Sequence, residues 1–392
     1  MAYTALVQNL ADAVHKDAAL LQAFNSAIAS SKQAAPDTYA DIQTFADFLA
    51  FIDMFAAWVP CTSPDVRVID QVLYMLCKFY FVFNQDELRH LSQTWTTAGN
   101  VKEPIPWLSD WLVLYTRQIG LFMDSRQSLT KESLQTFRSR QDYHMEDYIE
   151  PREGWSSFNH FFARHIKPGA RPIHGLADDS IIVSPGDSSF AGSWPVDQDG
   201  YIELKHARWN VRKLLQGSKY QNDFDGGVFS HSCLHINDYH RLHSPVAGKV
   251  LEAFKTAGEV YLEIGVKDKK NVCANVRVGS LPDELDFVDG EGHQWFQMRG
   301  LILLDSPIGL VAVIAVAMAQ IASVVITAQE GRQLHKGEEI CYFQYGGSDI
   351  VLLFQKKSNV HFTAQVTTPP THYKARQMIA QARLEAGSSV TR

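Results

Sequence analysis

The sequence predicts an α+β fold, in which a helical N-terminal domain over residues 1–150 precedes a β-rich, barrel-sandwich-like domain over residues 151–392. Before residue 150, apolar residues recur at steps of three and four, which is the period of a helix that buries one face. From Ile181 onward they form short runs bounded by Gly, Pro and Asp, as strands do. We place the domain boundary around Glu150–Ser157, where the pattern changes.

Apolar residues with helical spacing predict three helices in the first domain. The first buries a face made of Ile42, Phe45, Phe48, Leu49, Ile52 and Phe55. The second begins at Ser63 and Pro64, since Ser caps a helix and Pro suits its first turn, and it continues through Val66–Phe83. The third covers Trp107–Phe122, whose aromatic residues favour core packing over a groove for a cofactor.

The second domain is expected to be mostly β. Apolar runs of strand length lie at Ile181–Val183, Gly248–Phe254, Glu259–Val266, Leu301–Leu304, Leu310–Val316, Val324–Thr327 and Ile350–Phe354. Two stretches, Ser244–Val250 and Glu330–Ile340, share one design, in which a strand turns sharply at Gly or Pro beside another strand. This similarity predicts a barrel-like sandwich built of two related halves.

The apolar run Gly309–Ala328 is long enough to cross a membrane. It is rich in Val and Ile, is interrupted by Gln320 and Ser323, and lacks flanking Lys, Arg, Trp or Tyr anchors. These features favour two consecutive buried strands. We therefore expect no stable insertion into a membrane.

Composition and charge narrow the classes of partner. The net charge of -7 supplies no basic field for phosphate backbones, so we expect no nucleic-acid partner. The five cysteines are widely spaced and form no C-x-x-C pair, which favours a reduced, intracellular setting. Near the N-terminus, charged residues such as Asp12 and Lys16 interrupt any signal-peptide core, so a cytoplasmic location is expected.

Two turns of the second domain carry reactive side chains. Asp187 ends the turn SPGD just after an apolar run, and taken alone it is a turn or capping residue. Gly346 and Gly347 precede Ser348 between two strand-like runs, which taken alone indicates a hairpin turn.

Four histidines lie close together in the sequence between these turns: His231, His235, His240 and His243. Imidazoles are common zinc ligands and common acids and bases at neutral pH. The spacing matches no H-E-x-x-H motif. From the residues alone, a metal site, acid–base chemistry and structural hydrogen bonds all stay open.

Four motifs follow one another along the second domain: FFARHIKPGARPI at 161–173, SPGD at 184–187, DYHRLHSPVAG at 238–248, and KGEEICYF at 336–343 followed by Gly347 and Ser348. Together they resemble the entry motif, the S-P-x-D turn, the D-Y-H-R-x-H-x-P-x-x-G signature and the cleavage site of the phosphatidylserine decarboxylase family. The resemblance runs from about Trp155 to the last residue.

The helical part adds a second likeness. The phrases IQTFADFLAFIDMF and IGLFMDSRQSL resemble the N-terminal domain of the soluble fungal branch of this family, which includes the L-tryptophan decarboxylase of psilocybin biosynthesis. That branch is also similar in having Gly-Gly-Ser at the cleavage point. The likeness implies a free, aromatic L-amino acid as the substrate, and it extends the match over almost the whole chain.

The resemblance implies that the chain cuts itself between Gly347 and Ser348, and that Ser348 becomes a pyruvoyl group, the covalent cofactor. The hydroxyl of Ser348 would attack the carbonyl of Gly347, and the resulting ester would eliminate. His240, oriented by Asp187, is assigned to activate the hydroxyl, and His243 is a second polar partner. No metal ligand is assigned. The cleaved C-terminal fragment is expected to stay as a partner of the rest of the chain.

The pyruvoyl group is expected to form a Schiff base with the substrate amine and to accept the electron pair left by CO2. His240 is also expected to protonate the carbanion. Two other functions compete with this one: decarboxylation of phosphatidylserine at a membrane, and a non-catalytic β-sandwich or histidine metal site in which Ser348 is an ordinary turn residue.

The chain departs from the family pattern at three places. Val316-Ala-Met318 stands where many members have V-G-A, and Ile340-Cys341 replaces the usual L-G, which adds bulk inside expected strands. Asp349 follows the serine where Thr or Ser is commoner. Its charge beside the new pyruvoyl group either slows elimination or selects a cationic substrate, and both effects stay open.

Overall fold

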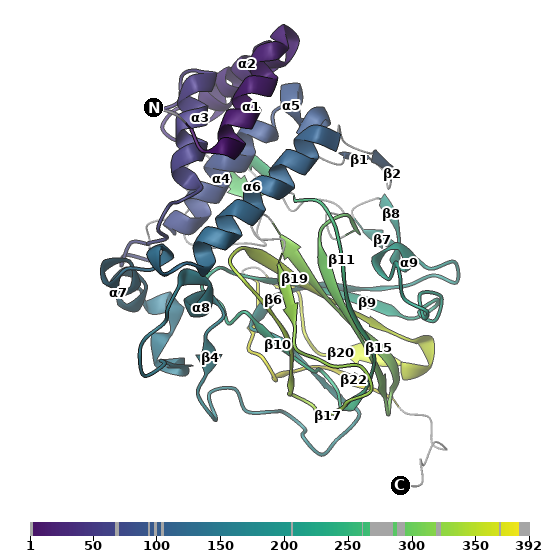
Figure 1. Ribbon diagram of the computed structural model, residues 1–392. Coiled ribbons are helices and arrows are strands. Elements are labelled where there is room, and N and C mark those ends of the chain that lie inside the picture. The colour runs from purple at the N-terminus through teal and green to yellow at the C-terminus, as the bar shows by residue number, and fades with distance from the viewer. Residues whose placement is uncertain are drawn as a thin grey trace.

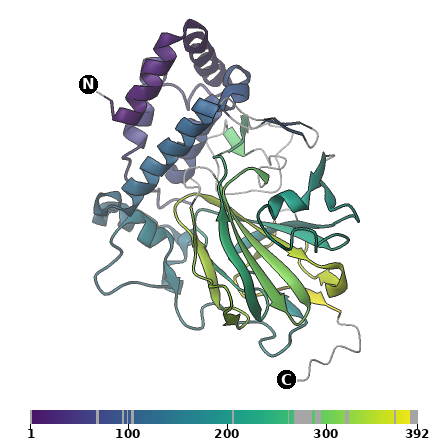
Figure 2. The same ribbon diagram turned by 45° about the vertical axis from the view of Figure 1, so that its right-hand side comes forward.

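Helices gather at one end of the molecule and strands at the other, as both views of the ribbon show (Figures 1 and 2). This computed structural model describes residues 3–66, 70–92, 95–97, 100–102, 106–204, 207–260, 262–266, 285–287, 295–318, 323–367 and 370–383. The α+β fold expected from the sequence is confirmed. The position of the domain boundary near residue 150 stays a prediction.

The helical part contains α1 (Ala5–Lys16), α2 (Ala18–Ala34), α3 (Phe45–Phe55), α4 (Gln71–Phe83), α5 (Asp86–Ser92) and α6 (Pro106–Asp124). The first and third predicted helices are confirmed as α3 and α6. Helix α3 begins at Phe45 because the Thr44 side chain accepts a hydrogen bond from the Asp47 amide, and the Asp47 carboxylate accepts one from the Thr44 amide in return.

The predicted start of the second helix at Ser63 and Pro64 is wrong. Helix α4 begins at Gln71, where the Asp70 carboxylate accepts a hydrogen bond from the Val72 amide at 2.9 Å. The hydroxyl of Tyr143 donates to the other carboxylate oxygen of Asp70 at 2.8 Å. This distant partner fixes Asp70 as the cap, so the start depends on tertiary contacts that a local Ser-Pro signal does not contain.

An eight-stranded antiparallel sheet forms the centre of the second part, in the order β17-β11-β14-β15-β19-β9-β6-β21. Its strands are β6 (Ser188–Pro195), β9 (Val228–Leu234), β11 (Gly248–Thr256), β14 (Arg299–Ser306), β15 (Gly309–Met318), β17 (Gln333–Leu334), β19 (Gly347–Phe354) and β21 (His372–Tyr373). The sheet is open, with β17 and β21 at its edges. The apolar run from Gly309 thus begins with a central strand, as predicted.

Two three-stranded sheets lie beside the large one. The first has the order β10 (Arg241–His243), β18 (Glu339–Phe343), β16 (Val324–Ile326), and the second β20 (Val360–Phe362), β22 (Met378–Ala382), β5 (Ile181–Val183). Short ribbons pair β1 (Trp95–Thr97) with β2 (Asn100–Lys102), β3 (Tyr148–Ile149) with β4 (His165–Ile166), β7 (Tyr201–Leu204) with β8 (Ala207–Asn210), and β12 (Ile264–Val266) with β13 (Leu285–Phe287). Three short helices are α7 (Lys131–Ser139), α8 (Phe158–Phe162) and α9 (Val211–Leu214).

Strand β19 is buried on both faces, which explains its continuous apolar run. Ile350 and Leu352 belong to one core, together with residues of the two three-stranded sheets. Val351 and Leu353 belong to a second core, which residues of β7, β8 and α9 cover. A sandwich-like arrangement results, with β19 in its middle layer.

The helices share the first of these cores with the sheets. Phe79 of α4 and Tyr115 of α6 belong to the same continuous set of buried side chains as Phe343 of β18. Polar contacts also cross between the two parts, since the amide of Ile264 donates to the side chain of Asn84 at 2.6 Å. The helical part is therefore packed directly against the strands that surround β19.

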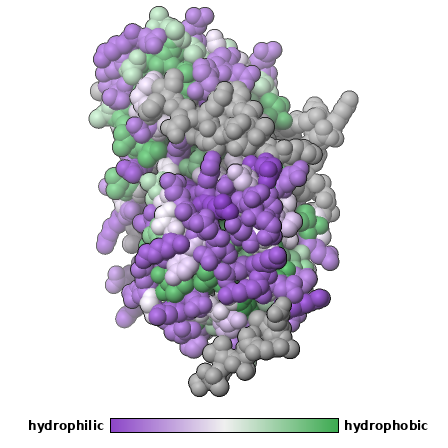
Figure 3. All heavy atoms as spheres, turned by 90° about the vertical axis from the view of Figure 1, so that its right-hand side faces the viewer, coloured by the Kyte–Doolittle hydropathy of each residue, from purple (hydrophilic) through white to green (hydrophobic). Residues whose placement is uncertain are grey.

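The surface differs between the two ends. On the face seen in Figure 3, hydrophobic residues gather mainly at the helical end, and hydrophilic residues cover most of the strand-rich end. Among the residues that the structure describes, no helix has both the length and the apolar character that a membrane span requires.

Candidate active site around Ser348

Ser348 lies in the centre of the large sheet, at the second position of β19. It is opposite Ala317 of β15 on one side and Leu234 of β9 on the other. Strand β18 ends at Phe343 in a different sheet, so the intervening segment connects two sheets and is not the hairpin that Gly-Gly alone indicates. Gly346 has a φ of 147°, a conformation that other residues rarely adopt, so the turn ahead of Ser348 needs glycine there.

His240 is the side chain that meets the Ser348 hydroxyl. Its Nδ1 lies 3.2 Å from Ser348 Oγ, and its Nε2 lies 3.2 Å from the carbonyl oxygen of Ile236. A carbonyl oxygen only accepts, so Nε2 carries the hydrogen and donates to Ile236. In the neutral ring, Nδ1 then has a lone pair that accepts the hydrogen of the Ser348 hydroxyl. This is the orientation that a general base requires.

Burial keeps His240 neutral. The side chain is fully buried, and Phe162 stacks on its ring with the ring centroids 3.9 Å apart. Burial, followed by the positive charge of Arg164, lowers the pKa of His240 from 6.5 to about 4. The imidazole is therefore uncharged at neutral pH and available as a proton acceptor.

Asp187 occupies a different set of contacts from the predicted one. Its carboxylate forms an ion pair with Arg171 at 2.6 Å and accepts a hydrogen bond from the Ala375 amide at 2.7 Å. Among the described residues, no hydrogen bond or ion pair joins Asp187 to His240. The backbone carbonyl of Ile236 orients the ring instead. The assignment of Asp187 to self-cleavage stays a prediction.

The turn that carries Asp187 is nevertheless adjacent to the strand of His243. A Cβ at Gly186 would lie 2.7 Å from a methyl carbon of Leu242, so only glycine allows the turn to come this close. The His243 amide donates to the carbonyl of Pro185 at 2.8 Å. The turn of Asp187 and the strand of His243 therefore lie side by side.

His243 is also buried and neutral. Its Nδ1 lies 2.9 Å from the carbonyl of Gly337, and its Nε2 lies 2.9 Å from the hydroxyl of Tyr239. Burial, followed by the charge of Arg376, lowers the pKa of His243 from 6.5 to about 3. No hydrogen bond joins His243 to Ser348 among the described residues, and its catalytic role stays a prediction.

The four clustered histidines do not form one metal site. His231 pairs with Asp349 at 2.8 Å, and His235 lies 3.0 Å from the hydroxyl of Ser189. The other two contact Ser348 and Tyr239, as described above. Strand alternation and the turn after β9 direct the four rings to four different sets of partners.

Several residues that shape this site received no role from the sequence. Arg171 and Phe162 both lie inside the 161–173 motif, so the motif itself was the available signal. The carbonyl of Ile236 carried no such signal, because every residue has a backbone acceptor and only the fold selects one.

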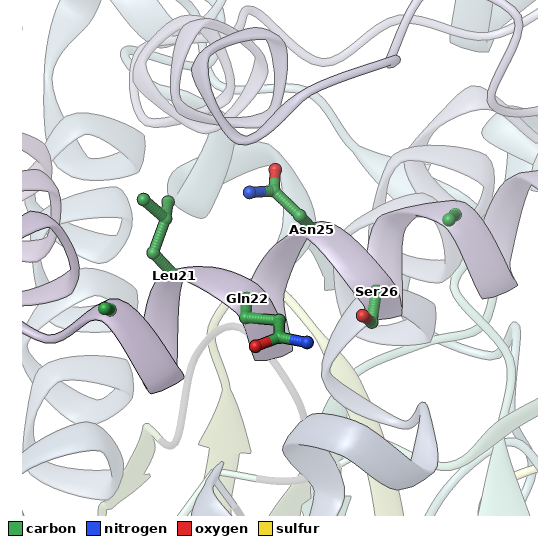
Figure 4. A pocket seen from close by; sticks show the side chains of 6 residues that line it. Leu21, Gln22, Asn25 and Ser26 are labelled. Atoms are coloured by element: carbon green, nitrogen blue, oxygen red, sulfur yellow. The ribbon is translucent and has the colours of Figure 1, made fainter.

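A surface hollow elsewhere is lined entirely by one helix. It runs along α2 between Ala18 and Ala29, with Leu21, Gln22, Asn25 and Ser26 on its wall (Figure 4). None of these lining residues carries a charge or a strong base. The hollow therefore offers no chemistry comparable to that around Ser348.

The fold places a buried serine–histidine pair beside a turn that requires glycine. Comparison with known proteins identifies the family of the chain. The family model for phosphatidylserine decarboxylase matches residues 158–381, which is more than half of the sequence. The chain belongs to this family.

Individual relatives agree with the family match. Phosphatidylserine decarboxylase proenzyme 3 of Schizosaccharomyces pombe is 33% identical over 215 residues, which are 55% of this chain and 20% of that protein. The phosphatidylserine decarboxylase proenzyme of Ruminiclostridium cellulolyticum is 28% identical over 246 residues, or 62% of this chain and 74% of that protein. Decarboxylase iboD of Amanita muscaria is 29% identical over 266 residues, or 64% of this chain and 75% of that protein.

The matched segment covers different shares of the relatives' own lengths. The chain spans 20% of the S. pombe protein and 33% of a rice relative, phosphatidylserine decarboxylase proenzyme 2. Both are much longer proteins.

Proposed function

We propose that the chain is a self-processing, pyruvoyl-dependent decarboxylase that acts on a free amino acid. The observation that carries the proposal is the 3.2 Å contact between Ser348 Oγ and the proton-accepting Nδ1 of His240. The names of several relatives contain the word proenzyme, which supports processing of the chain.

His240 is the proposed base for the cut. Its Nδ1 takes the proton of the Ser348 hydroxyl while the oxygen attacks the carbonyl carbon of Gly347. The same proton then passes to the amide nitrogen of Ser348 as the peptide bond breaks, which leaves an ester between the two residues. One ring serves both steps, first as the neutral imidazole that accepts the proton and then as the imidazolium that donates it, and Ile236 already sets its orientation.

The ester is converted by loss of the α-hydrogen of residue 348 and departure of the Gly347 carboxylate. Water then replaces the nitrogen of residue 348 as ammonia, so that a ketone caps the new chain. The pyruvoyl group supplies a carbonyl that condenses with an amine and accepts the electron pair left by CO2. His240 lies beside residue 348 and is proposed to return the proton to the substrate carbon.

Denaturing electrophoresis and mass spectrometry test the processing step. The proposal expects a C-terminal fragment of 45 residues, counted from Ser348 to Arg392, with a pyruvoyl mass at its first position. Ser348→Ala should stay one intact chain, and His240→Ala should be cut at least about 100-fold more slowly, which is the usual contribution of a general base. His235→Gln, in the same loop, should be cut normally. An intact wild-type chain would refute the proposal.

The substrate class is proposed to be a free aromatic amino acid such as tryptophan. The likeness of the helical part to the soluble fungal branch supports this choice. Decarboxylase iboD also matches the chain, and its name, unlike those of the other relatives described above, contains no lipid. Phosphatidylserine is the second candidate, because the names of the yeast and bacterial relatives contain it.

Turnover assays separate the two substrates. Processed protein is offered tryptophan, tyrosine, and vesicles that contain phosphatidylserine, and amine formation and released CO2 are measured. Product from tryptophan or tyrosine, with none from vesicles, supports the proposal. Product from vesicles alone would assign the lipid as the substrate.

A further inference from the structure

The face of the sheet opposite the Ser348 hydroxyl carries a second reactive cluster. Asp349 follows Ser348 directly, so its side chain points to the other face of β19. Cys233 of β9 lies directly across from Asp349, and His231 precedes Cys233 by two positions. Strand alternation therefore places the carboxylate, the thiol and the imidazole on one face of two neighbouring strands.

These three groups converge at close range. Asp349 Oδ2 lies 2.8 Å from His231 Nε2, and Cys233 Sγ lies 3.7 Å from the same nitrogen. One ligand-type atom from each residue lies within 4.8 Å of both others. His231 and Asp349 are buried, whereas Cys233 is partly exposed, so an ion from solvent has a route to the cluster.

Two of the three separations, those that involve His231 Nε2, are close to those of a tetrahedral zinc site. With zinc bonds of about 2.0 Å to nitrogen and oxygen and about 2.3 Å to sulfur, neighbouring N and S ligands lie about 3.5 Å apart, and N and O ligands about 3.3 Å apart. The sulfur and nitrogen of Cys233 and His231 already have nearly this separation. The carboxylate of Asp349 needs to withdraw by only about half an ångström to admit an ion.

We infer that His231, Cys233 and Asp349 form a binding site for a divalent transition metal of the zinc class. A thiolate and an imidazole favour such an ion over Ca²⁺ or Mg²⁺, which prefer oxygen ligands. The ion replaces the thiol proton and the proton between the imidazole and the carboxylate. Thiolate and carboxylate together then balance its two positive charges, and a water molecule completes four ligands.

A metal ion bound at this site would link the two fragments on either side of the proposed cut. Asp349 is the first residue after the proposed cut, whereas His231 and Cys233 belong to the other fragment. A bound ion would tie the new end of β19 to β9 across that break. The cluster itself forms in the folded chain whether or not the bond at Gly347 is cut, so its metal binding is tested independently of the proposed function.

Metal binding is measured on tag-free, chelator-treated protein by equilibrium dialysis with Zn²⁺ and by titration with Co²⁺. Wild type and the uncut Ser348→Ala chain should each bind one ion and show the intense near-ultraviolet absorption of a cobalt–thiolate bond. Cys233→Ser and Asp349→Asn should lose the ion. Cys61→Ser, which removes another partly exposed thiol, should retain it.

Protection of the thiol gives a readout that needs no variant. Zn²⁺ should slow alkylation of Cys233 in the wild-type chain and leave alkylation of Cys61 unchanged, as measured by peptide mass spectrometry. A folded wild-type chain that binds neither ion overturns the inference, as does a cobalt–thiolate signal that survives in Cys233→Ser. If Ser348→Ala binds the ion but wild type is never cut, the metal site stands and the proposed function fails.

Discussion

A single protonation state decides whether His240 can act on Ser348. Its pKa of about 4 lies below the ordinary value of 6.5, so the neutral, proton-accepting ring persists as the pH falls from neutral towards 5. Only below that range does the folded protein hold the ring as the imidazolium, which has no lone pair at Nδ1.

Self-cleavage should therefore keep its rate down to about pH 5 and decline around pH 4. The rate is measured on precursor made by cell-free synthesis and transferred to buffers across the acidic range, with circular dichroism to show that the chain is still folded. A decline centred near pH 6.5 in folded protein would contradict the buried, neutral His240 described above.

Asp187 is held by an ion pair whose loss should affect folding. Both Asp187 and Arg171 are buried, so Asp187→Asn leaves the guanidinium partly uncompensated. In a Ser348→Ala background, we expect the free energy of unfolding to fall by about 3 kcal/mol, measured by urea denaturation. An unchanged unfolding curve, combined with lost cleavage when Ser348 is restored, would instead support the catalytic role predicted from the sequence.

The structure agrees with the sequence analysis on one contact of the candidate site and differs from it on another. His240 and Ser348 lie together as the motifs indicate, although they are 108 positions apart. The contact of Asp187 with Arg171 could not be predicted, because a carboxylate near several cations and histidines pairs with whichever the fold brings closest. Spacing along one chain does not encode that choice.

At the scale of elements, helix α6 and helix α8 hold the segment that leads into Ser348. The side-chain oxygen of Asn159 in α8 accepts a hydrogen bond from the Tyr345 amide at 3.0 Å. The amide group of Asn159 donates to Asp124 at the end of α6 at 2.9 Å, and Gln344 donates to the same carboxylate oxygen at 3.3 Å. The helical part thereby positions the turn at which we propose cleavage.

Removing this support should slow cleavage. Asn159→Ala leaves the buried Tyr345 amide without its acceptor. We expect the transition state for cleavage to lose about 1.4 kcal/mol of stabilisation, which corresponds to a tenfold lower rate. Pulse-chase electrophoresis measures the rate. Asn210→Ala, which removes the side-chain cap of α9, is the control and should cut at the wild-type rate. Equal slowing in both variants would show a general loss of stability and not a positioning role.

The elements most accessible to prediction were those with strong periodic patterns. Strands β11, β14, β15 and β19 of the large sheet and helix α6 follow directly from their apolar runs, whereas no apolar run predicts β6, β9 or β21. The predicted start of α4 is wrong because the local Ser-Pro signal near residue 63 is not the residue that caps the helix. The cap is Asp70, and its partner Tyr143 lies far along the chain. Helix ends depend on such contacts more than helix interiors do.

At the scale of the whole molecule, a cut before Ser348 would divide the large sheet between two chains. The C-terminal piece would contain β19 from Ser348 onward and the strands that follow it, whereas β15 and β9, the neighbours of β19, would belong to the other piece. The two pieces would stay together through buried strands without a covalent link.

Recovery from denaturation should therefore differ between the two forms. Uncut Ser348→Ala refolds as one chain, so its yield should not depend on dilution while aggregation is avoided. Processed protein must reunite two chains, and its yield after denaturation in urea should fall as concentration falls. Native fluorescence after dilution measures both yields. Equal yields across the dilution series would argue against a shared sheet.

Because His240 and Ser348 come from distant parts of the chain, the proposed cut would occur only in correctly assembled molecules. The base reaches the hydroxyl only after β18, β19 and the connecting turn have docked between their neighbours, which requires almost the entire chain to have been synthesised and arranged. A misfolded molecule would stay uncut and would lack the pyruvoyl group. Processing would therefore be limited to correctly folded molecules, without any other protein to select them.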